Sequence, residues 1–181
     1  MARNKALLFW PVLVAVSVSD AVTKALAQRW LPLPDLPHAV LGNTVRFTLV
    51  YNPGAAFGIS FGGYSRWIFM TLTIVALLIL ARMYAGTRNG NGARTLALAL
   101  VCGGALGNLM DRVWSRMGVV DFIDIGLRNA RWPTFNLADM AVSVGAVLLA
   151  LVLWAEDREA VSAAARGVAS PLSEPSAGEL S

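Results

Sequence analysis

Cysteine and histidine are almost absent from this chain, which holds one of each, Cys102 and His38, in 181 residues. A single cysteine cannot build an intramolecular disulfide framework. One cysteine and one histidine also do not supply the clustered ligands of a zinc site. We therefore expect no structural or catalytic metal and no cofactor.

Charged residues are also scarce: they make up 14% of the chain, against 56% hydrophobic residues, and the mean hydropathy is +0.59. This composition is too apolar for an ordinary soluble domain and indicates a membrane protein. The net charge is +4, but the basic residues are scattered and form no dense run with interleaved aromatics, so we expect no nucleic-acid partner.

Four apolar segments have about the length that is needed to cross a bilayer core. They run from Ala6 to about Trp30, Trp67 to Tyr84, Thr95 to Arg112, and Leu137 to Trp154. The sequence therefore predicts an all-α membrane protein with four transmembrane helices. Tryptophans mark several of the expected ends, as in an interfacial aromatic belt.

The first apolar segment has an alternative interpretation as a cleaved signal peptide. Arg3 and Lys5 precede it, and Ala25-Leu26-Ala27 resembles a processing site. Against this, Asp20 and Lys24 are four residues apart on one helical face. Such a pair suits a retained helix that turns its charges toward a bundle.

The connections between the predicted helices differ in character. "NTVRFTLVYNPGAAFG" alternates like a strand followed by a turn, which predicts a small β element between the first and second helices. Residues 113–136, with "VVDFID", are expected to form a second large loop on the same side. We expect a membrane domain over 1–155 and a flexible tail over 156–181.

Carboxylates are the main candidates for chemistry. They lie near the ends of the last two predicted helices or in the loop between them: Asp111, Asp121, Asp124 and Asp139. Two carboxyl groups about 3 Å apart share one proton, so that one activates water while the other polarises a carbonyl, as in an aspartyl protease. A loop whose acids only face water, and a Ser/Lys pair of Lys24 with Ser60 or Ser65, remain alternatives.

Further polar residues follow helical spacing. Gly104, Asn108, Asp111 and Arg112 share one predicted helix face, where a small residue allows close approach and the others bond across the bundle. Asn136 and Asp139 share the start of the last helix, where Asn136 also suits a simple cap. In "YNPGAAFG", Asn52 and the small residues after it leave room for an extended peptide. Packing seams and ordinary turns have the same composition.

Taken together, these motifs resemble lipoprotein signal peptidase, the bacterial type II signal peptidase, over roughly residues 10–155. The resemblance rests on "DAVTK", "YNPGAAFG", "GGALGNLMDRV", "VVDFID" and "FNLADMAVSVGA", in this order. One departure is Ala21, where the family commonly has Gln. The similarity implies four helices with both termini cytoplasmic, a small periplasmic β element and a catalytic aspartate dyad near the outer surface. The Lys and Arg counts of the two sides nearly tie and do not decide this orientation.

Carried over by motif, the dyad would be Asp121 and Asp139, while Asp111 and Asp124 would stand outside it. Residues assigned by the resemblance to substrate positioning are Asn52, Asn108, Arg112 and Asn136. The implied reaction is endopeptidase cleavage before the lipidated cysteine of a diacylglyceryl-modified prolipoprotein, in the bacterial inner membrane. The expected partners are this substrate and membrane lipids, with no obligate protein partner.

Two other classes compete with a protease. An ion-coupled transporter would use Asp20, Lys24 and Asp111 as a relay, but the sequence lacks the paired repeats and broken helices of that class. A scaffold protein packed through Gly103 and Gly107 would leave the loop acids unexplained.

Overall fold

The computed structural model describes residues 4–31, 33–56, 59–127 and 130–168. Its helices are α1 (Ala6–Trp30), α2 (Ser65–Gly86), α3 (Gly92–Trp114) and α4 (Leu137–Val168), with a 3-10 turn at Gly62–Tyr64 before α2. All four α-helices are long and apolar enough to span a membrane. The prediction of four such helices is confirmed.

The last helix is longer than predicted. It does not end at Trp154 but continues to Val168, through the first part of the segment that was expected to be a flexible tail. Residues 169–181 lie outside the described residues. The apolar run ends near Trp154, whereas Ala-rich sequence with good helix propensity carries the helix further.

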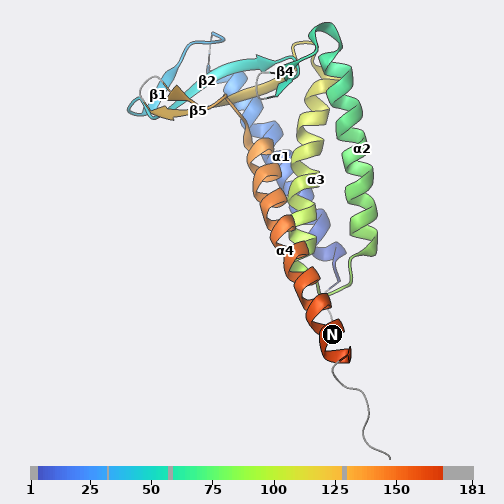
Figure 1. Cartoon of the computed structure of the whole chain (residues 1–181). Helices are drawn as coiled ribbons and strands as arrows, with labels where there is room; N and C mark the ends of the chain where they lie inside the picture. Colours follow the sequence, from blue (N-terminus) through green and yellow to red (C-terminus); the bar gives the residue numbers. More distant parts are fainter. Residues whose placement is uncertain (1–3, 32, 57–58, 128–129, 169–181) are drawn as a thin grey trace, which may run out of the picture.

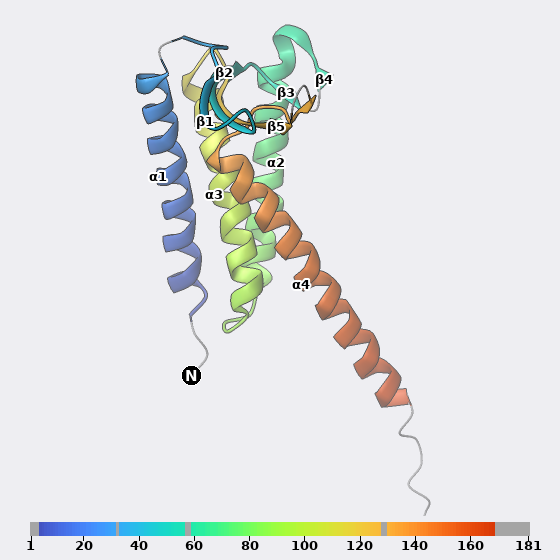
Figure 2. The same cartoon turned by 90° about the vertical axis from the view of Figure 1, so that its left-hand side faces the viewer.

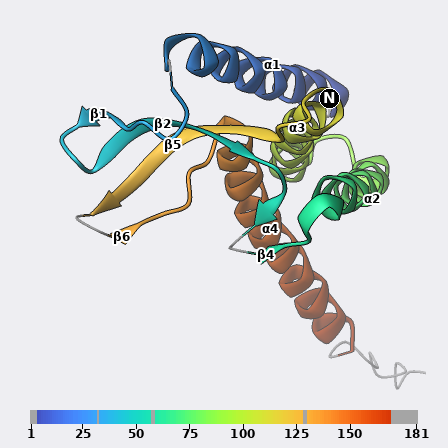
Figure 3. The same cartoon turned by 90° about the horizontal axis from the view of Figure 1, so that it is seen from above.

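Helix α3 is the centre of the bundle and contacts each of the other three helices (Figure 3). Half of its most apolar stretch is buried, against 6% for α2. Its glycines allow the close contacts: Gly103 lies against Val16 of α1, and Gly104 lies against Ala138 at the start of α4. This is the small-residue packing typical of membrane helices, as predicted for Gly104. Towards its C-terminal end α4 diverges from α1 (Figure 2).

A small antiparallel sheet lies across one end of the bundle, while the first turn of α1 and the last turns of α4 lie at the other end (Figure 1). Its strand order is β1-β2-β5-β6, and the remaining strands β3 and β4 form a separate pair. Strands β1 (His38–Leu41), β2 (Val45–Asn52), β3 (Ala55–Ala56) and β4 (Ile59–Ser60) connect α1 to α2, whereas β5 (Val119–Leu127) and β6 (Ala130–Arg131) connect α3 to α4.

The sheet therefore corrects two expectations. It is not confined to the segment between the first two helices, because β5 and β6 come after α2 and α3 in the chain. "VVDFID" is not a loop but most of β5, paired with β2 so that Val50 faces Asp121 and Arg46 faces Asp124. Its β-branched and aromatic residues suit a strand, but the partner strand comes from a distant part of the chain.

The buried Asp124 of β5 forms ion pairs with two half-buried arginines, Arg46 of β2 and Arg131 of β6, and so connects the three strands. Its carboxylate accepts hydrogen bonds from Arg131 Nε at 2.5 Å, Arg46 Nε at 2.9 Å and Thr48 Oγ1 at 3.0 Å. Desolvation alone would raise the pKa of Asp124, but these hydrogen bonds outweigh it, and the pKa lies below its ordinary value. Asp124 therefore has a structural place in the sheet, outside the pair of candidate catalytic acids.

We expect Asp124→Asn to lower the stability of the protein at neutral pH by about 1–3 kcal/mol, because charge-assisted hydrogen bonds are lost. The lowered pKa stabilises the fold above the ordinary aspartate pKa, and this contribution disappears as the pH falls through the lowered value. Thermal unfolding in detergent should therefore show a gap in melting temperature between wild type and variant, and this gap should become smaller as the pH is lowered. The exposed Asp35→Asn serves as control; a gap that stays constant with pH would contradict the explanation.

Candidate active site

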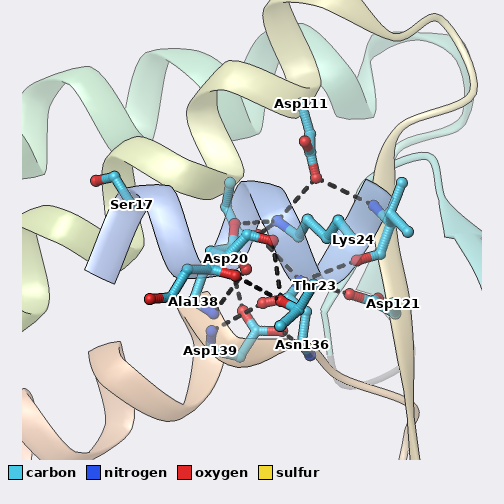
Figure 4. Close-up of polar contacts among 12 residues, drawn as sticks. Ser17, Asp20, Thr23, Lys24, Asp111, Asp121, Asn136, Ala138 and Asp139 are labelled. Carbon is cyan, nitrogen blue, oxygen red and sulfur yellow. Dashed lines mark hydrogen bonds and ion pairs between the residues drawn. The ribbon is translucent and has the colours of Figure 1, made fainter. Parts of the chain in front are cut away.

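Asn136 joins Asp121 and Asp139, the two carboxylates that the resemblance assigns to the dyad (Figure 4). It is fully buried, and its Nδ2 donates to Asp121 Oδ1 at 2.7 Å. Its backbone N–H donates to Asp139 Oδ2 at 3.3 Å, and its Oδ1 accepts from the backbone N–H of Asp139 at 2.9 Å. The last two bonds form a reciprocal cap at the start of α4. Both interpretations of Asn136, helix cap and partner of the acids, are thus seen in one residue.

Asp121 is held in β5 with 3% of its surface exposed. Its second oxygen accepts a hydrogen bond from Asn52 Nδ2 at 3.3 Å, because the pairing of β2 with β5 brings the end of β2 alongside. Desolvation, followed by the charge of Asp139, raises the pKa of Asp121 to about 7, although hydrogen bonds from Asn52 and Asn136 act in the opposite direction. Two carboxyl groups in electrostatic contact, one of them titrating near neutrality, suit acid–base chemistry.

Asp139 occupies the first turn of α4 and is less buried than Asp121. Its Oδ1 accepts a hydrogen bond from Asn108 Nδ2 of α3 at 2.7 Å. Asn108 Oδ1 in turn accepts from Asn136 Nδ2 at 3.1 Å. The structure thus brings Asn108, Asn136 and both acids into one hydrogen-bonded group.

A buried ion cluster supports this group from the side of α1. Lys24 Nζ contacts Asp20 Oδ2 at 2.7 Å, Asp111 Oδ2 at 2.8 Å and Asn108 Oδ1 at 3.0 Å. The predicted Asp20–Lys24 ion pair is confirmed. These three contacts use the three ammonium hydrogens of Lys24, whereas the Ser65 hydroxyl accepts a hydrogen bond from the backbone N–H of Phe61 at 2.7 Å. The geometry therefore favours an ion pair over a Ser65/Lys24 nucleophile and base; the side chain of Ser60 is not among those described.

Asp20 also reaches the last helix. Its Oδ1 accepts a hydrogen bond from the backbone N–H of Ala138 at 2.9 Å, so that a side chain of α1 caps α4. Gly107 makes room for this carboxylate, because a Cβ at that position would lie 2.5 Å from Asp20 Oδ2. Sequence reasoning identified the ion pair but missed this cap, since its acceptor and donor are 118 residues apart.

Arg112 lies beside the acids on the side of α2. Its guanidinium is 5.7 Å from the ring centre of Phe69 and interacts electrostatically with Asp139, Asp121 and Asp111. One of its N–H groups bonds the backbone oxygen of Asn108 at 3.1 Å, whereas its buried Nε has no hydrogen-bond partner among the described residues. Arg112 thus has an N–H donor without a described partner in the neighbourhood of the two carboxylates.

The turn after β2 completes the surroundings of Asp121. Asn52 Oδ1 accepts a hydrogen bond from the backbone N–H of Gly54 at 3.0 Å, and Gly54 has φ of 115° and lies against Ser65 and Phe69 of α2. A side chain there would meet both strain and collision. Phe57 and Gly58 of the same motif lie outside the described residues. Within the described ranges, no group of three or more His, Cys, Asp or Glu side chains is arranged to hold a metal.

We expect Lys24→Met to lower the free energy of unfolding by about 3–5 kcal/mol, because it leaves the buried Asp20 and the half-buried Asp111 without their cation. The double variant Asp20→Asn/Lys24→Met should recover part of this loss, since one anion is removed and the amide oxygen still accepts from Ala138. Thermal unfolding in detergent measures both, with the exposed Arg88→Met as control. A double variant that is no more stable than Lys24→Met would contradict the role of the uncompensated charge.

Known proteins with similar sequences are lipoprotein signal peptidases. A family model described as signal peptidase (SPase) II matches residues 12–155. The lipoprotein signal peptidase of Paraburkholderia phytofirmans is 41% identical over 153 residues, covering 83% of this chain and 87% of the relative. That of Halothermothrix orenii is 40% identical over 149 residues, covering 81% and 95%.

Two solved structures share the fold. Each is described as a bacterial membrane enzyme. One has a TM-score of 0.73 at 29% identity and covers 87% of this chain and 94% of its own. The other has a TM-score of 0.68 at 32% identity and covers 78% and 89%. With four apolar helices and a family model that matches most of its length, this chain belongs to the signal peptidase II family of lipoprotein signal peptidases.

Proposed function

We propose that this chain is an intramembrane aspartyl endopeptidase that removes signal peptides from diacylglyceryl-modified prolipoproteins, cleaving before the lipidated cysteine. The observation that carries the proposal is the pair Asp121 and Asp139, joined by the buried Asn136 side chain and backbone. The relatives that this chain matches are named lipoprotein signal peptidases. We propose Asp121 and Asp139 as the catalytic acids and Asn52, Asn108, Arg112 and Asn136 as the residues that position substrate and acids.

The chemistry follows from two carboxyl groups that share one proton. The ionised acid takes a proton from a water molecule as its oxygen attacks the scissile carbonyl carbon, and the other acid protonates the carbonyl oxygen. The tetrahedral intermediate then collapses with protonation of the leaving nitrogen. Arg112, whose Nε has no partner within the described chain, is suited to bind a carbonyl oxygen of the substrate.

The location of the acids suits a membrane-embedded substrate. Exposed tryptophans lie at the sheet end of the bundle and form an interfacial belt there: Trp30, Trp67, Trp114 and Trp132. A signal helix can approach the bundle within the bilayer while its lipid chains stay among other lipids. The scissile bond then lies at the depth of the acids, where anchoring of remote parts aligns it with the attacking water.

The same geometry supports a multi-pass arrangement in the bacterial inner membrane. Both the start of α1 and the end of α4 lie opposite the sheet (Figure 1). We propose that these helix ends face the cytoplasm and that the sheet and the acids lie near the periplasmic surface.

We expect Asp121→Asn and Asp139→Asn each to lower cleavage of a lipid-modified prolipoprotein peptide by the reconstituted protein by about 10²- to 10⁴-fold, because neither amide can exchange protons in the reaction. Both variants should insert into membranes and elute from size-exclusion chromatography like wild type. Asp35→Asn, an exposed acid in the segment before β1, is the matched control and should cleave normally.

The assay also separates the competing classes. Substantial cleavage by either variant would refute the assignment of the acids. Ion flux through proteoliposomes without any cleavage by wild type would favour the transporter class instead.

A further inference from the structure

We propose that Asp139 is the ionised member of the acid pair and Asp121 the protonated member. We further propose that Lys24 determines which acid holds the proton, because it orients the side-chain amide of Asn108. The inference rests on the proposed function and specifies how the same site works. It assigns Asp139 as the base that activates water and Asp121 as the acid that protonates the scissile carbonyl. Lys24 and Asn108 are positioning residues in this scheme.

The contact with Lys24 determines how the side-chain amide of Asn108 is oriented. An ammonium group only donates, so the atom of Asn108 that faces Lys24 Nζ at 3.0 Å must be the carbonyl oxygen. The amide NH₂ is therefore turned toward Asp139 Oδ1, 2.7 Å away. The other oxygen of Asp139 accepts the backbone N–H of Asn136. Both oxygens of Asp139 thus meet donors, the environment that a carboxylate prefers.

Asp121 also accepts two N–H groups, so the number of hydrogen bonds does not distinguish the acids. Their surroundings do. Asp139 lies in the first turn of α4, where the helix N-terminus stabilises negative charge. Asp121 lies within a strand between the buried Val120 and Phe122, with 3% exposure, where an anion is poorly solvated. Its bond from Asn52, at 3.3 Å, is long.

The charged groups around the pair come from α3 and α1. From α3, Arg112 interacts more strongly with Asp139 than with Asp121. From α1, the charge of Lys24 lowers the pKa of Asp121, but this effect is smaller than those of burial and of Asp139, and Lys24 is paired with Asp20 and Asp111. Burial and the neighbouring charge of Asp139 raise the pKa of Asp121 to about 7, so this acid keeps its proton below neutrality.

The assignment gives a balanced reaction. Asp139 takes a proton from water, the water oxygen bonds to the carbonyl carbon, and Asp121 gives its proton to the carbonyl oxygen. When the carbon–nitrogen bond breaks, Asp139 passes its proton to the leaving nitrogen, and Asp121 recovers a proton from a hydroxyl of the intermediate. The products are a carboxyl group and an amine, and both acids return to their starting states.

The test compares the pH dependence of kcat/KM in Asn108→Leu and Asn52→Leu. The acidic limb reports the acid that must be ionised, and the alkaline limb the acid that must be protonated. Loss of an N–H donor raises the pKa of its acceptor. We expect Asn108→Leu to move the acidic limb upward by about one pH unit and Asn52→Leu to move the alkaline limb upward. The reverse pattern would overturn the assignment.

A second test separates the effect of Lys24 on the orientation of the Asn108 amide from the effect of its positive charge. Lys24→Gln/Asp111→Asn removes one positive and one negative charge, so the net charge of the cluster is unchanged, but the glutamine can accept as well as donate and no longer fixes Asn108. We expect the acidic limb of the kcat/KM profile of this double variant to move to higher pH, as in Asn108→Leu. Lys24→Arg should leave the acidic limb where it is in wild type, because arginine only donates hydrogen bonds. An unmoved limb in the double variant would refute the role of Lys24.

Infrared spectroscopy locates the proton without turnover. Asp139→Asn removes the charge that helps to raise the pKa of Asp121 but leaves its burial, the larger cause. As the pH is lowered from neutrality, the stretching band of the protonated carboxyl should therefore be present in Asp139→Asn at pH values where it is absent from Asp121→Asn. Persistence in Asp121→Asn with loss in Asp139→Asn would overturn the proposal. Because this measurement needs no substrate, its outcome is independent of whether the protein cleaves lipidated prolipoproteins.

Discussion

The start of helix α4 is the constraint on which the site depends. A helix begins with backbone N–H groups that need acceptors from outside the helix. Here the Oδ1 atoms of Asn136 and Asp20 provide two of them, for Asp139 and Ala138 respectively. The caps fix where α4 begins and therefore where the Asp139 carboxylate lies. The same Asn136 side chain then donates to Asp121, so that helix capping and the pairing of the two acids are one arrangement.

Close helix packing makes this arrangement stable inside an apolar environment. The glycines of α3 let α1 and α4 approach until Asp20 can reach across to Ala138. The charges buried there are compensated, since Lys24 contacts two carboxylates and one amide oxygen. At the end of the bundle, an apolar cluster that includes Ala27, Leu49 and Phe122 joins α1 to the sheet. The sheet thereby holds Asp121 against the helices that carry its partners.

Several features were visible in the sequence because they depend on local spacing. Four apolar runs predicted the four helices, and the separation of Asp20 from Lys24 predicted their ion pair. Asn136 followed three residues later by Asp139 predicted a cap. The strand character of "VVDFID" was missed, since a short apolar run with two acids does not reveal its pairing partner. The extension of α4 to Val168 was missed because the prediction followed hydrophobicity, whereas helix propensity continues past Trp154.

By itself, the sequence determined the membrane class, the number of helices and the set of polar residues that gather at one end, because these follow from composition and periodicity along the chain. The tertiary structure decided which of these residues touch. The register of β2 against β5 brings Asn52 to Asp121, and the crossing of α1 over α3 brings Lys24 to Asn108. Such contacts join residues 69 and 84 positions apart. Only packing in three dimensions selects among the many pairings that the sequence allows.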